Sequence, residues 1–349
     1  MSTEASVDAV FASVVSTPLA VLERFAAERF GVLATATRLV AERDENVHLR
    51  AEDGREFVLK LTNPAEDPLV TGFHTDALLH IARVDRTLPV PQLVRSHAGH
   101  VEETIVTDGA PARIARLFTF MPGVPLYRAP RSALQRHMLG RCLARLDRAL
   151  QGFHPVLAGH ELAWDLQHAA RLRPLLDEIE DPARRSLATL FLDRFERHVV
   201  PRLPELRTQV IHNDYQPYNV LVDATAGIEV TGVIDFGDAV VAPLINDVAV
   251  ACAYHVDGAP RPFDHVAELL AGYTDIVPLR PVEVAILSDL LTTRMVMTVA
   301  ISNWRARRQP ENQAYILRNA PPAWRGLERC ALIHRDDAAH QLTAACTLE

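Results

Sequence analysis

Three polar side chains between residues 210 and 238 have types and spacings that suit transfer of a phosphoryl group. Asp214 ends an H-x-D triplet, Asn219 follows five residues later, and Asp235 begins the run D-F-G-D. A phosphoryl group in transfer carries negative charge, which Mg²⁺ held by a carboxamide and a carboxylate can balance. Asn219 and Asp235 are therefore the expected metal ligands. Asp214 is the expected catalytic residue, because a carboxylate on a rigid loop can orient an alcohol and accept its proton.

The sequence around these residues predicts a β-hairpin. Residues 220–222 follow Asn219 as one short run of β-branched and aliphatic side chains, and residues 230–234 form a second run directly before Asp235. Ala226-Gly227 between the runs is a turn signal. Such a hairpin would bring the two expected metal ligands close together.

The spaced H-x-D, N and D-F-G elements resemble the catalytic signature of kinases. Asn213 inside the triplet and Asp238 after the glycine depart from the protein-kinase pattern. The segments HNDYQPYNVLV and IDFGDAVVAPLINDVAVACAYH instead resemble the aminoglycoside phosphotransferase and choline kinase superfamily of small-molecule kinases. Within it the chain is most similar to the hydroxylysine kinase branch and less similar to type II homoserine kinases. The resemblance covers most of the chain and is strongest across residues 210–255.

The resemblance implies an α+β, two-lobed protein-kinase-like fold, with a small N-terminal lobe built on an antiparallel sheet and a larger, mainly helical C-terminal lobe. The run RIARLFTF, followed by M-P-G, resembles the last strand and the hinge of the small lobe. We therefore expect a nucleotide-binding lobe at residues 1–121 and a catalytic and acceptor-binding lobe at residues 122–349. Apart from the predicted hairpin, we expect the second lobe to be helical, with one helix from about Asp165 to Glu180. Main-chain groups around Phe118 and Phe120 would contact adenine. The implied cofactors are ATP or GTP and Mg²⁺.

The N-terminal part of the chain predicts the framework of the small lobe. Residues 19–30 have apolar side chains at helical spacing and stop at Gly31, a natural C-cap. Residues 46–50 and 55–61 are predicted strands on either side of an E-D-G turn. The second strand carries Lys60 where the family carries its phosphate-binding lysine. The alternative is a solvated strand lysine, but the chain has few lysines and uses arginine as its usual cation.

No glycine-rich phosphate loop precedes Lys60. The segment ERDEN, residues 42–46, instead resembles a turn of the hydroxylysine kinase branch, which could offer backbone N–H groups and the Asn46 amide to phosphates.

A helix predicted over residues 69–83 corresponds to the family's lysine-orienting helix. Its acidic position holds His74, with Asp76 two residues later. We expect one of these two residues to pair with Lys60. If neither does, the lysine is positioned by other means and a catalytically silent protein becomes more credible.

Three residues are candidates for contact with the acceptor. Arg294 lies in an apolar helical run and needs a carboxylate partner, either an internal one such as Asp247 or that of the substrate. Asp165 resembles part of a W-D-L element of the hydroxylysine kinase branch and would either bind a substrate ammonium or cap the following helix. Asp238 is the third candidate. Asp247 is otherwise expected to cap the helix that starts at Asn246 and to steady the metal-binding loop.

Composition limits the remaining function classes. The 349 residues, 23% charged and 48% hydrophobic, suit a soluble globular protein with two lobes. A net charge of -8 gives no electrostatic case for nucleic acid or an anionic membrane. Four cysteines without a C-x-x-C pair indicate reduced thiols and a cytoplasmic location. We expect neither an export signal nor a membrane span, because the N-terminus lacks a basic region and the apolar stretch at 239–253 is interrupted.

Hydrolase signatures are missing from the sequence. The 15 histidines form no H-E-x-x-H motif or Cys/His ligand set, and there is no G-x-S-x-G elbow. Three alternatives remain: a kinase for a hydroxy amino acid or amino alcohol, an antibiotic phosphotransferase, and a silent nucleotide-binding or interaction protein. Arg294 favours the first alternative, because an arginine could bind the carboxylate of an amino acid. A polycationic antibiotic would instead call for an acidic pocket. The sequence leaves open the identity of the alcohol, the choice between ATP and GTP, and the oligomeric state.

Overall fold

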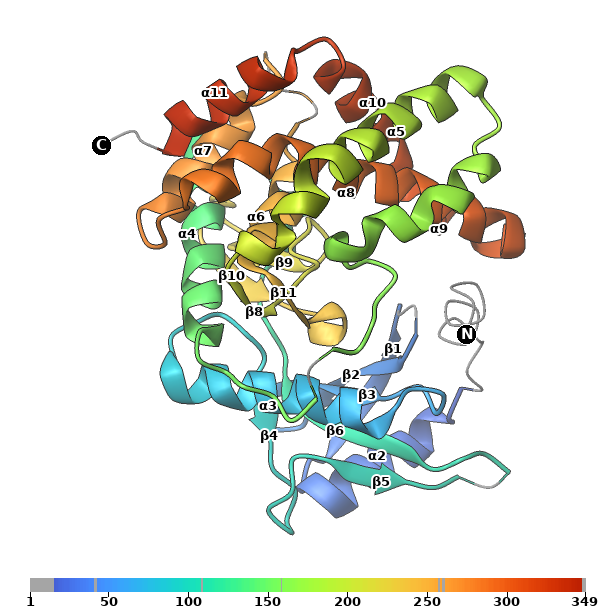
Figure 1. The fold of residues 1–349 in the computed structure, drawn as a ribbon. Coiled ribbons are helices and arrows are strands. Elements are labelled where there is room, and N and C mark those ends of the chain that lie inside the picture. Colours follow the sequence, from blue (N-terminus) through green and yellow to red (C-terminus); the bar gives the residue numbers. More distant parts are fainter. Residues whose placement is uncertain are drawn as a thin grey trace. The chain divides into compact units, whose positions relative to one another are not determined.

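The protein forms two compact units in the computed structural model (Figure 1), which describes residues 16–40, 43–107, 109–157, 159–256, 258 and 261–346. The first unit is Met1–Pro122 together with His154–His160, and the second is Gly123–Phe153 together with Glu161–Glu349. The first is built on an antiparallel sheet and the second is mainly helical. The predicted α+β fold class is confirmed.

The sheet of the first unit has the strand order β1-β2-β3-β6-β4, and β5 also pairs with β6. Every one of these pairings is antiparallel. The strands are β1 (Ala34–Leu39), β2 (Glu45–Ala51), β3 (Glu56–Leu61), β4 (Leu93–Val94), β5 (Glu103–Ile105) and β6 (Arg113–Thr119). The predicted hairpin around the E-D-G turn is confirmed as β2 and β3.

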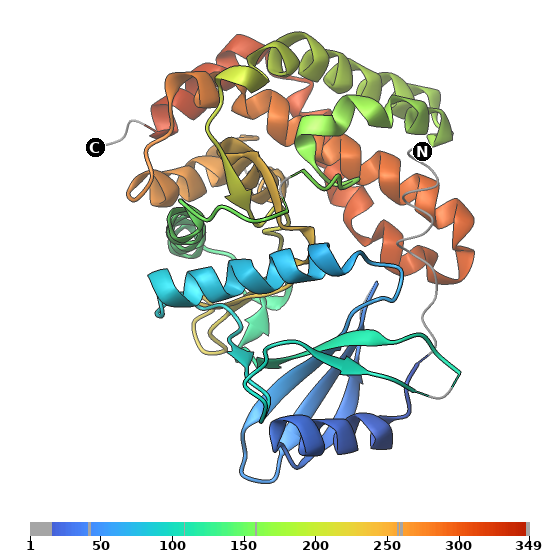
Figure 2. The same cartoon turned by 60° about the horizontal axis from the view of Figure 1, so that its bottom comes forward.

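Helices cover both faces of this sheet (Figure 2). α2 (Leu19–Phe30) packs its apolar side chains against one face, in a core that includes Val47, Leu49 and Leu59. It ends where predicted, at Gly31, whose φ of 67° is a left-handed conformation that glycine adopts at little cost. α3 (Pro68–Val84) covers the other face. Because side chains alternate along a strand, that second face carries Lys60.

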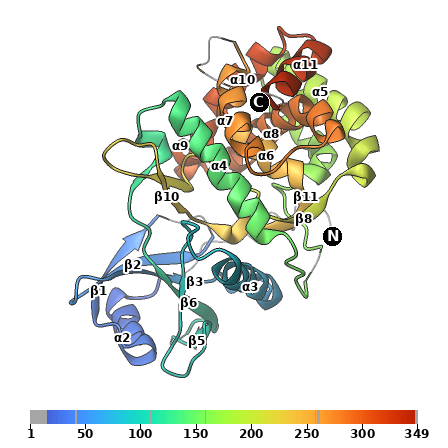
Figure 3. The same cartoon turned by 90° about the vertical axis from the view of Figure 1, so that its left-hand side faces the viewer.

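The second unit is organised around α8, which lies among the other helices of the unit (Figures 1 and 3). Most side chains of α8 are buried. α6, α10 and α11 are among the helices that pack against it. The helices of the unit are α4 (Ala133–Leu150), α5 (Pro182–Arg194), α6 (Leu244–Ala253), α7 (Asp264–Thr274), α8 (Pro281–Arg308), α9 (Gln313–Ile316), α10 (Ala320–Cys330) and α11 (Arg335–Cys346).

α8 is also the one helix in the described part of the chain that is long and apolar enough to cross a membrane, by length and composition alone. The apolar window that meets this criterion is 94% buried inside the protein. Core helices of globular proteins pass the same test, so this is weak evidence for a span.

Two small sheets lie within the second unit. β9 (Val220–Val222) pairs with β10 (Val230–Val233), which confirms the predicted hairpin, and with β7 (Val124–Pro125). β8 (Thr208–Ile211) pairs with β11 (Val240–Pro243). We had expected only helices around the hairpin, and this was wrong for β7, β8 and β11. Strands of two to four residues are too short for their periodicity to be recognised in sequence.

Shorter helical segments complete the second unit. The helix predicted from Asp165 to Glu180 is a 3₁₀ segment, Leu166–Glu178, that contains Pro174, a residue without a backbone N–H donor. The others are 3₁₀ segments at Leu126–Arg128, Val200–Glu205, Phe236–Asp238, Pro310–Asn312 and Leu317–Asn319, and a π-helical segment at Phe195–Val199.

Candidate active site

The Asp214 carboxylate is held by donors on three other residues of the second unit. Its Oδ2 accepts hydrogen bonds from Asn219 Nδ2 at 2.6 Å and from Gln216 Nε2 at 3.0 Å. Its Oδ1 accepts from Arg294 Nη2 at 2.9 Å. Hydrogen bonds to ionised groups are stronger than neutral ones. The carboxylate is therefore fixed in position on the loop between β8 and β9.

The surroundings of Asp214 also change its acidity. Burial raises the pKa of Asp214 to about 6, and the nearby charge of Asp238 adds to this effect while Arg294 opposes it. A carboxylate with a pKa closer to neutrality accepts a proton more readily than an ordinary aspartate does. Asp214 thus has the fixed geometry and the raised pKa expected of a general base.

Asn219 and Asp235 flank the β9–β10 hairpin. The backbone carbonyl of Asn219 accepts a hydrogen bond from the N–H of Ile234 at 2.9 Å, so the two ends of the hairpin are joined directly before Asp235. The Asn219 amide nitrogen donates to Asp214, and its carbonyl oxygen lies on the other side of the amide group. Asp235 is exposed and has a φ of 63°, a rare conformation for an aspartate.

These two residues fit a magnesium site. A carboxamide oxygen and a carboxylate are the hard donors that Mg²⁺ takes, and Mg²⁺ commonly completes its shell with water and phosphate oxygens. The described residues contain no group of three or more His, Cys, Asp or Glu that could hold a metal by itself. Two donors would hold such a metal only together with water or with the phosphate oxygens of a nucleotide.

Asp247 on α6 anchors the loop that carries Asp214. Its carboxylate accepts hydrogen bonds from the backbone N–H groups of His212, at 2.9 Å, and Asn213, at 2.7 Å. The expectation that Asp247 caps a helix starting at Asn246 was wrong, because α6 begins earlier, at Leu244. Its side chain is instead committed to a loop more than 30 residues away in sequence.

Arg294 on α8 has an internal carboxylate partner, one of the two alternatives considered, although that partner is not Asp247. Its guanidinium binds Asp214, not Asp247, and also donates from Nη1 to the carbonyl oxygen of Trp164 at 3.2 Å. Its Cζ lies 4.8 Å from the centre of the Trp164 ring. Burial disfavours the charged form, yet Tyr254 and Asp214 beside it keep the pKa of Arg294 above its ordinary value. The guanidinium therefore places a fixed positive charge next to the Asp214 carboxylate.

The two other candidates for acceptor contact differ in their surroundings. Asp165 is almost fully buried, and its carboxylate accepts hydrogen bonds from Gln167 N at 3.0 Å and Gln167 Nε2 at 2.6 Å. This is the capping arrangement that we considered as an alternative to ammonium binding. Asp238 ends the 3₁₀ segment that follows Asp235, and its charge influences the pKa of Asp214. Asp238 thus places a second carboxylate in the neighbourhood of Asp214.

In the first unit, Lys60 on β3 forms an ion pair with Asp44, with 2.8 Å between Nζ and Oδ2. Among the described residues, neither His74 nor Asp76 forms an ion pair with Lys60, so that expectation was wrong. Asp76 is exposed on α3, while burial lowers the pKa of His74 well below its ordinary value and keeps it neutral. Asp44 could have been noticed as an acidic residue within the ERDEN segment.

The remaining residues expected to bind nucleotide lie on β2 and at the end of β6. Asn46 is the cross-strand neighbour of Lys60, and its Oδ1 is buried without a hydrogen-bond donor in the described part of the chain. Phe118 is buried, and the Phe120 ring lies 4.5 Å from that of His48. Glu42, the first residue of the ERDEN segment, lies outside the described residues. Contacts of these residues with a nucleotide stay a prediction.

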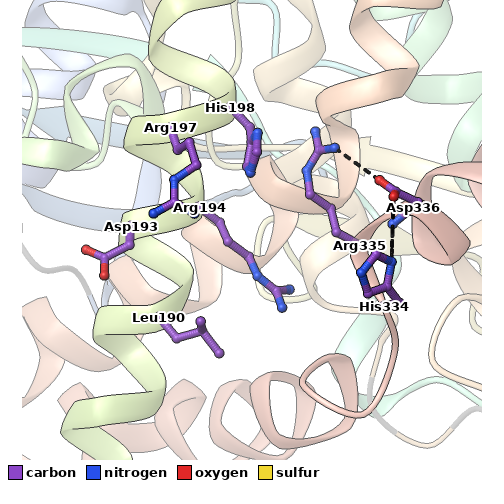
Figure 4. Close-up of a pocket in the computed structure, with 8 residues that line it drawn as sticks. All are labelled: Leu190, Asp193, Arg194, Arg197, His198, His334, Arg335 and Asp336. Carbon is purple, nitrogen blue, oxygen red and sulfur yellow. Dashed lines mark hydrogen bonds and ion pairs between the residues drawn. The ribbon is translucent and has the colours of Figure 1, made fainter.

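A hollow of about 460 Å³ opens elsewhere on the second unit, between α5, the π-helical segment and the start of α11 (Figure 4). Arginine and histidine side chains dominate its lining, but carboxylates offset part of the charge. Arg335 forms ion pairs with the buried Asp289 at 2.8 Å and with Asp336 at 3.6 Å. No residue that we predicted to be catalytic, to hold a metal or to contact a nucleotide or acceptor lines this hollow.

Comparison with known proteins places the chain in a family. Residues 35–281 match the model of the phosphotransferase enzyme family. The hydroxylysine kinase of Danio rerio is 25% identical over 320 residues, covering 88% of this chain and 90% of the relative. The hydroxylysine kinase of Mus musculus is 24% identical over 293 residues, covering 80% of this chain and 77% of the relative.

Solved structures share the fold. A microcompartment-associated aminopropanol kinase has a TM-score of 0.70 at 20% identity, covering 94% of this chain and 99% of that one. An amicoumacin kinase in complex with AMP-PNP and Ca²⁺ has a TM-score of 0.66 at 16% identity, covering 96% and 99%. With the family match over more than half of the chain, these findings agree with the site geometry. The chain belongs to the phosphotransferase enzyme family and is a small-molecule kinase that acts on a hydroxyl group.

Proposed function

We propose that this kinase transfers the γ-phosphoryl group of ATP, or of GTP, to the hydroxyl of a hydroxy amino acid or amino alcohol, with Mg²⁺ as the metal. The observation that carries the proposal is Asp214, whose carboxylate is 13% exposed, is held by Arg294, Asn219 and Gln216, and has its pKa raised to about 6. The acceptor class is supported by the relatives, which are named hydroxylysine kinases.

In this mechanism Asp214 orients the acceptor hydroxyl and accepts its proton as the oxygen attacks the γ-phosphorus and the bond to the departing nucleoside diphosphate breaks. Asn219 and Asp235 would hold Mg²⁺. The metal neutralises charge on the phosphates when it is bound. Lys60 supplies a further positive charge to the nucleotide phosphates, and Asp247 keeps the loop of Asp214 in place. The charge and hydrogen-bonding capacity of each of these side chains suit the role proposed for it.

We further propose that Asp238 attracts the ammonium group of the acceptor. Its negative charge contributes to the raised pKa of Asp214, and an ammonium group is attracted to such a charge. Asp165 is a weaker candidate, because both of its oxygens already accept hydrogen bonds from Gln167. Arg294 is best assigned to positioning Asp214, since its guanidinium already binds that carboxylate.

The second candidate function is that of an antibiotic phosphotransferase. It is favoured by likeness to the amicoumacin kinase and to a spectinomycin phosphotransferase, which has a TM-score of 0.57 at 15% identity and covers 96% of this chain and 100% of that one. These likenesses show the fold, whereas the hydroxylysine kinases match in sequence over 80% or more of the chain. Sequence relatives therefore favour the amino-acid acceptor.

A panel of acceptors separates the two functions. Release of nucleoside diphosphate is measured with 5-hydroxylysine, homoserine, 1-amino-2-propanol and spectinomycin. We expect the highest kcat/KM for a hydroxy amino acid or the amino alcohol. Preference for spectinomycin would place the antibiotic function first, and no acceptor-dependent release with any of the four compounds would contradict the proposed acceptor class.

The role of Asp238 is tested with the best acceptor of that panel. Asp238→Asn should lower kcat/KM by about tenfold or more, because one ion pair contributes roughly 1.5–3 kcal/mol when it is shielded from water. Glu229→Gln, which removes an exposed carboxylate from the neighbouring hairpin, is the matched control and should leave kcat/KM unchanged. Equal kcat/KM in all three proteins would remove Asp238 from the acceptor site.

A further inference from the structure

Lys60 is the only lysine among the 349 residues, and the other 35 basic residues of the Lys and Arg total are arginines. The two side chains are not equivalent. Arginine presents a planar fork of donors, whereas lysine presents a compact ammonium that acts as a point charge on a flexible stem. Lys60, at the end of β3, is therefore the one place where this chain has a lysine ammonium and not an arginine guanidinium. That ammonium must be oriented by an anion if it is to serve as a precise point charge.

The face of the sheet around Lys60 offers no such anion from α3. Arg116 is the cross-strand neighbour of Lys60, so the two cations share this face. The Arg116 guanidinium donates to the Thr71 carbonyl and to Thr75 Oγ1, each at 3.3 Å, and so fills the space next to α3. His74 on the same helix is neutral, and Asp76 is exposed. An acidic partner for Lys60 has to come from another element.

Asp44, in the turn before β2, supplies that partner. Its Oδ2 lies 2.8 Å from Lys60 Nζ, and the two side chains are only 11% and 16% exposed. Its Oδ1 accepts a hydrogen bond from the Asn63 backbone N–H at 2.8 Å, while Asn63 Nδ2 donates to the Arg43 carbonyl at 3.1 Å. The turn is thus fastened to the chain just beyond β3. Both oxygens of Asp44 are directed by fixed contacts.

The neighbouring Glu66 is a poorer partner for an ammonium. Burial and the charge of Asp44 raise the pKa of Glu66, whereas the pKa of Asp44 is lowered, because Lys60 and its other donors outweigh the cost of burial. Of these two carboxylates, the surroundings of Asp44 favour the charged form and those of Glu66 disfavour it.

We propose that Asp44 is the positioning residue for Lys60, in place of an acidic residue on α3. The inference rests on the proposed function, in which Lys60 binds the nucleotide phosphates. The orientation of the lysine then depends on the turn before β2 and on Asn63, so movement of α3 alone would not break the ion pair. This differs from the arrangement of protein kinases, in which the lysine pairs with a glutamate of a helix.

The single lysine allows a direct test by NMR. Protein grown with lysine labelled with ¹⁵N at Nζ has one ammonium signal, which we expect to be protected from exchange with water in the full-length chain without nucleotide. Asp44→Asn should abolish this protection, and Asp44→Glu should restore at least part of it. Asp53→Asn, which removes an exposed carboxylate from the β2–β3 turn, is the matched control and should leave the signal unchanged.

Kinetics with the same proteins test the consequence. Asp44→Asn should lower kcat/KM for the nucleotide by about 10²-fold, since a misplacement of about 1 Å has effects of that size. The thermal midpoint of each variant, measured alongside, shows whether the variant is folded. Asp44→Glu should recover part of the loss.

Different results would overturn the role of Asp44 and the proposed function. An unchanged ammonium signal in folded Asp44→Asn, or loss of the signal in Asp76→Asn instead, overturns the assignment of Asp44. A signal that responds to Asp44→Asn but not to added Mg²⁺-ADP, with no nucleotide-dependent activity in the wild type, supports the ion pair and contradicts the proposed function.

Discussion

At the scale of single residues, the Arg294–Asp214 pair decides how the carboxylate of the proposed base is held. Arg294 is 2% exposed, and its Nη2 lies 2.9 Å from Asp214 Oδ1. Taking two charges out of water is costly, and removing one member of such a pair commonly costs about 3–5 kcal/mol, because the other charge is left buried without its partner. The pair therefore couples the stability of the second unit to the geometry of its proposed base.

This coupling predicts a specific double-mutant result. Arg294→Met should lower the free energy of unfolding by about 3 kcal/mol in the wild-type background, and by much less in Asp214→Asn, where no buried charge is left unpaired. Urea denaturation of the four proteins measures both values. Equal losses in the two backgrounds would show that the ion pair does not couple the two residues.

The same variant distinguishes a positioning role from a substrate clamp. If Arg294 bound a substrate carboxylate, Arg294→Met would affect a hydroxy amino acid far more than its decarboxylated analogue. Because its guanidinium binds Asp214, we expect kcat to fall with both acceptors by a similar factor, on the order of 10². A loss confined to the carboxylated acceptor would restore the clamp interpretation.

At the scale of elements, α6 serves the site through Asp247 and is followed, two residues after its end, by the buried His255. Burial, followed by the charges of Arg131 and Arg136, lowers the pKa of His255 to about 3. His255 is therefore neutral in the folded protein at pH values where the unfolded chain already takes up a proton. Its contribution to stability is complete above the ordinary pKa of 6.5 and is lost as the pH falls from there towards 3.

Stability measured against pH tests this assignment. Between pH 6.5 and pH 5, His255 should account for about 2 kcal/mol of lost stability, at about 1.36 kcal/mol per pH unit. His255→Gln should flatten the pH dependence by that amount, whatever its effect at neutral pH. His340→Gln, at an exposed position on α11, is the control and should follow the wild type. Parallel curves for His255→Gln and the wild type would refute a buried neutral histidine.

The elements also show which parts of the fold the sequence could predict. α2 and the β2–β3 and β9–β10 hairpins were predictable, because each depends on local spacing and a turn signal. β8 and β11 were not, since each has four residues and they pair across about 30 positions. The 3₁₀ segment at Leu166–Glu178 was predicted as an ordinary helix, because its apolar spacing says nothing about how tightly the chain winds.

At the scale of the whole molecule, the residues proposed for catalysis are divided between the two units. Lys60 and Asp44 belong to the first, whereas Asp214, Asn219 and Asp235 belong to the second. The resemblance of short sequence motifs to those of the kinase family predicted a role for each of these residues except Asp44. Their partners could not be predicted, because Arg294 and Asp214 are 80 residues apart and only packing brings α8 to the loop. For Lys60 the family pattern predicted an ion-pair partner on α3, whereas its partner is Asp44 in the turn before β2.

The central claim is that the protein transfers a phosphoryl group to an alcohol, with Asp214 as the base. ³¹P NMR of a reaction containing ATP, Mg²⁺ and 5-hydroxylysine measures this transfer directly. The account predicts a phosphate monoester on the acceptor oxygen with wild type and with Glu229→Gln, and a rate lower by about 10²-fold or more with Asp214→Asn. A wild-type reaction that yields only inorganic phosphate, or an Asp214→Asn variant that forms the monoester at the wild-type rate, would contradict it.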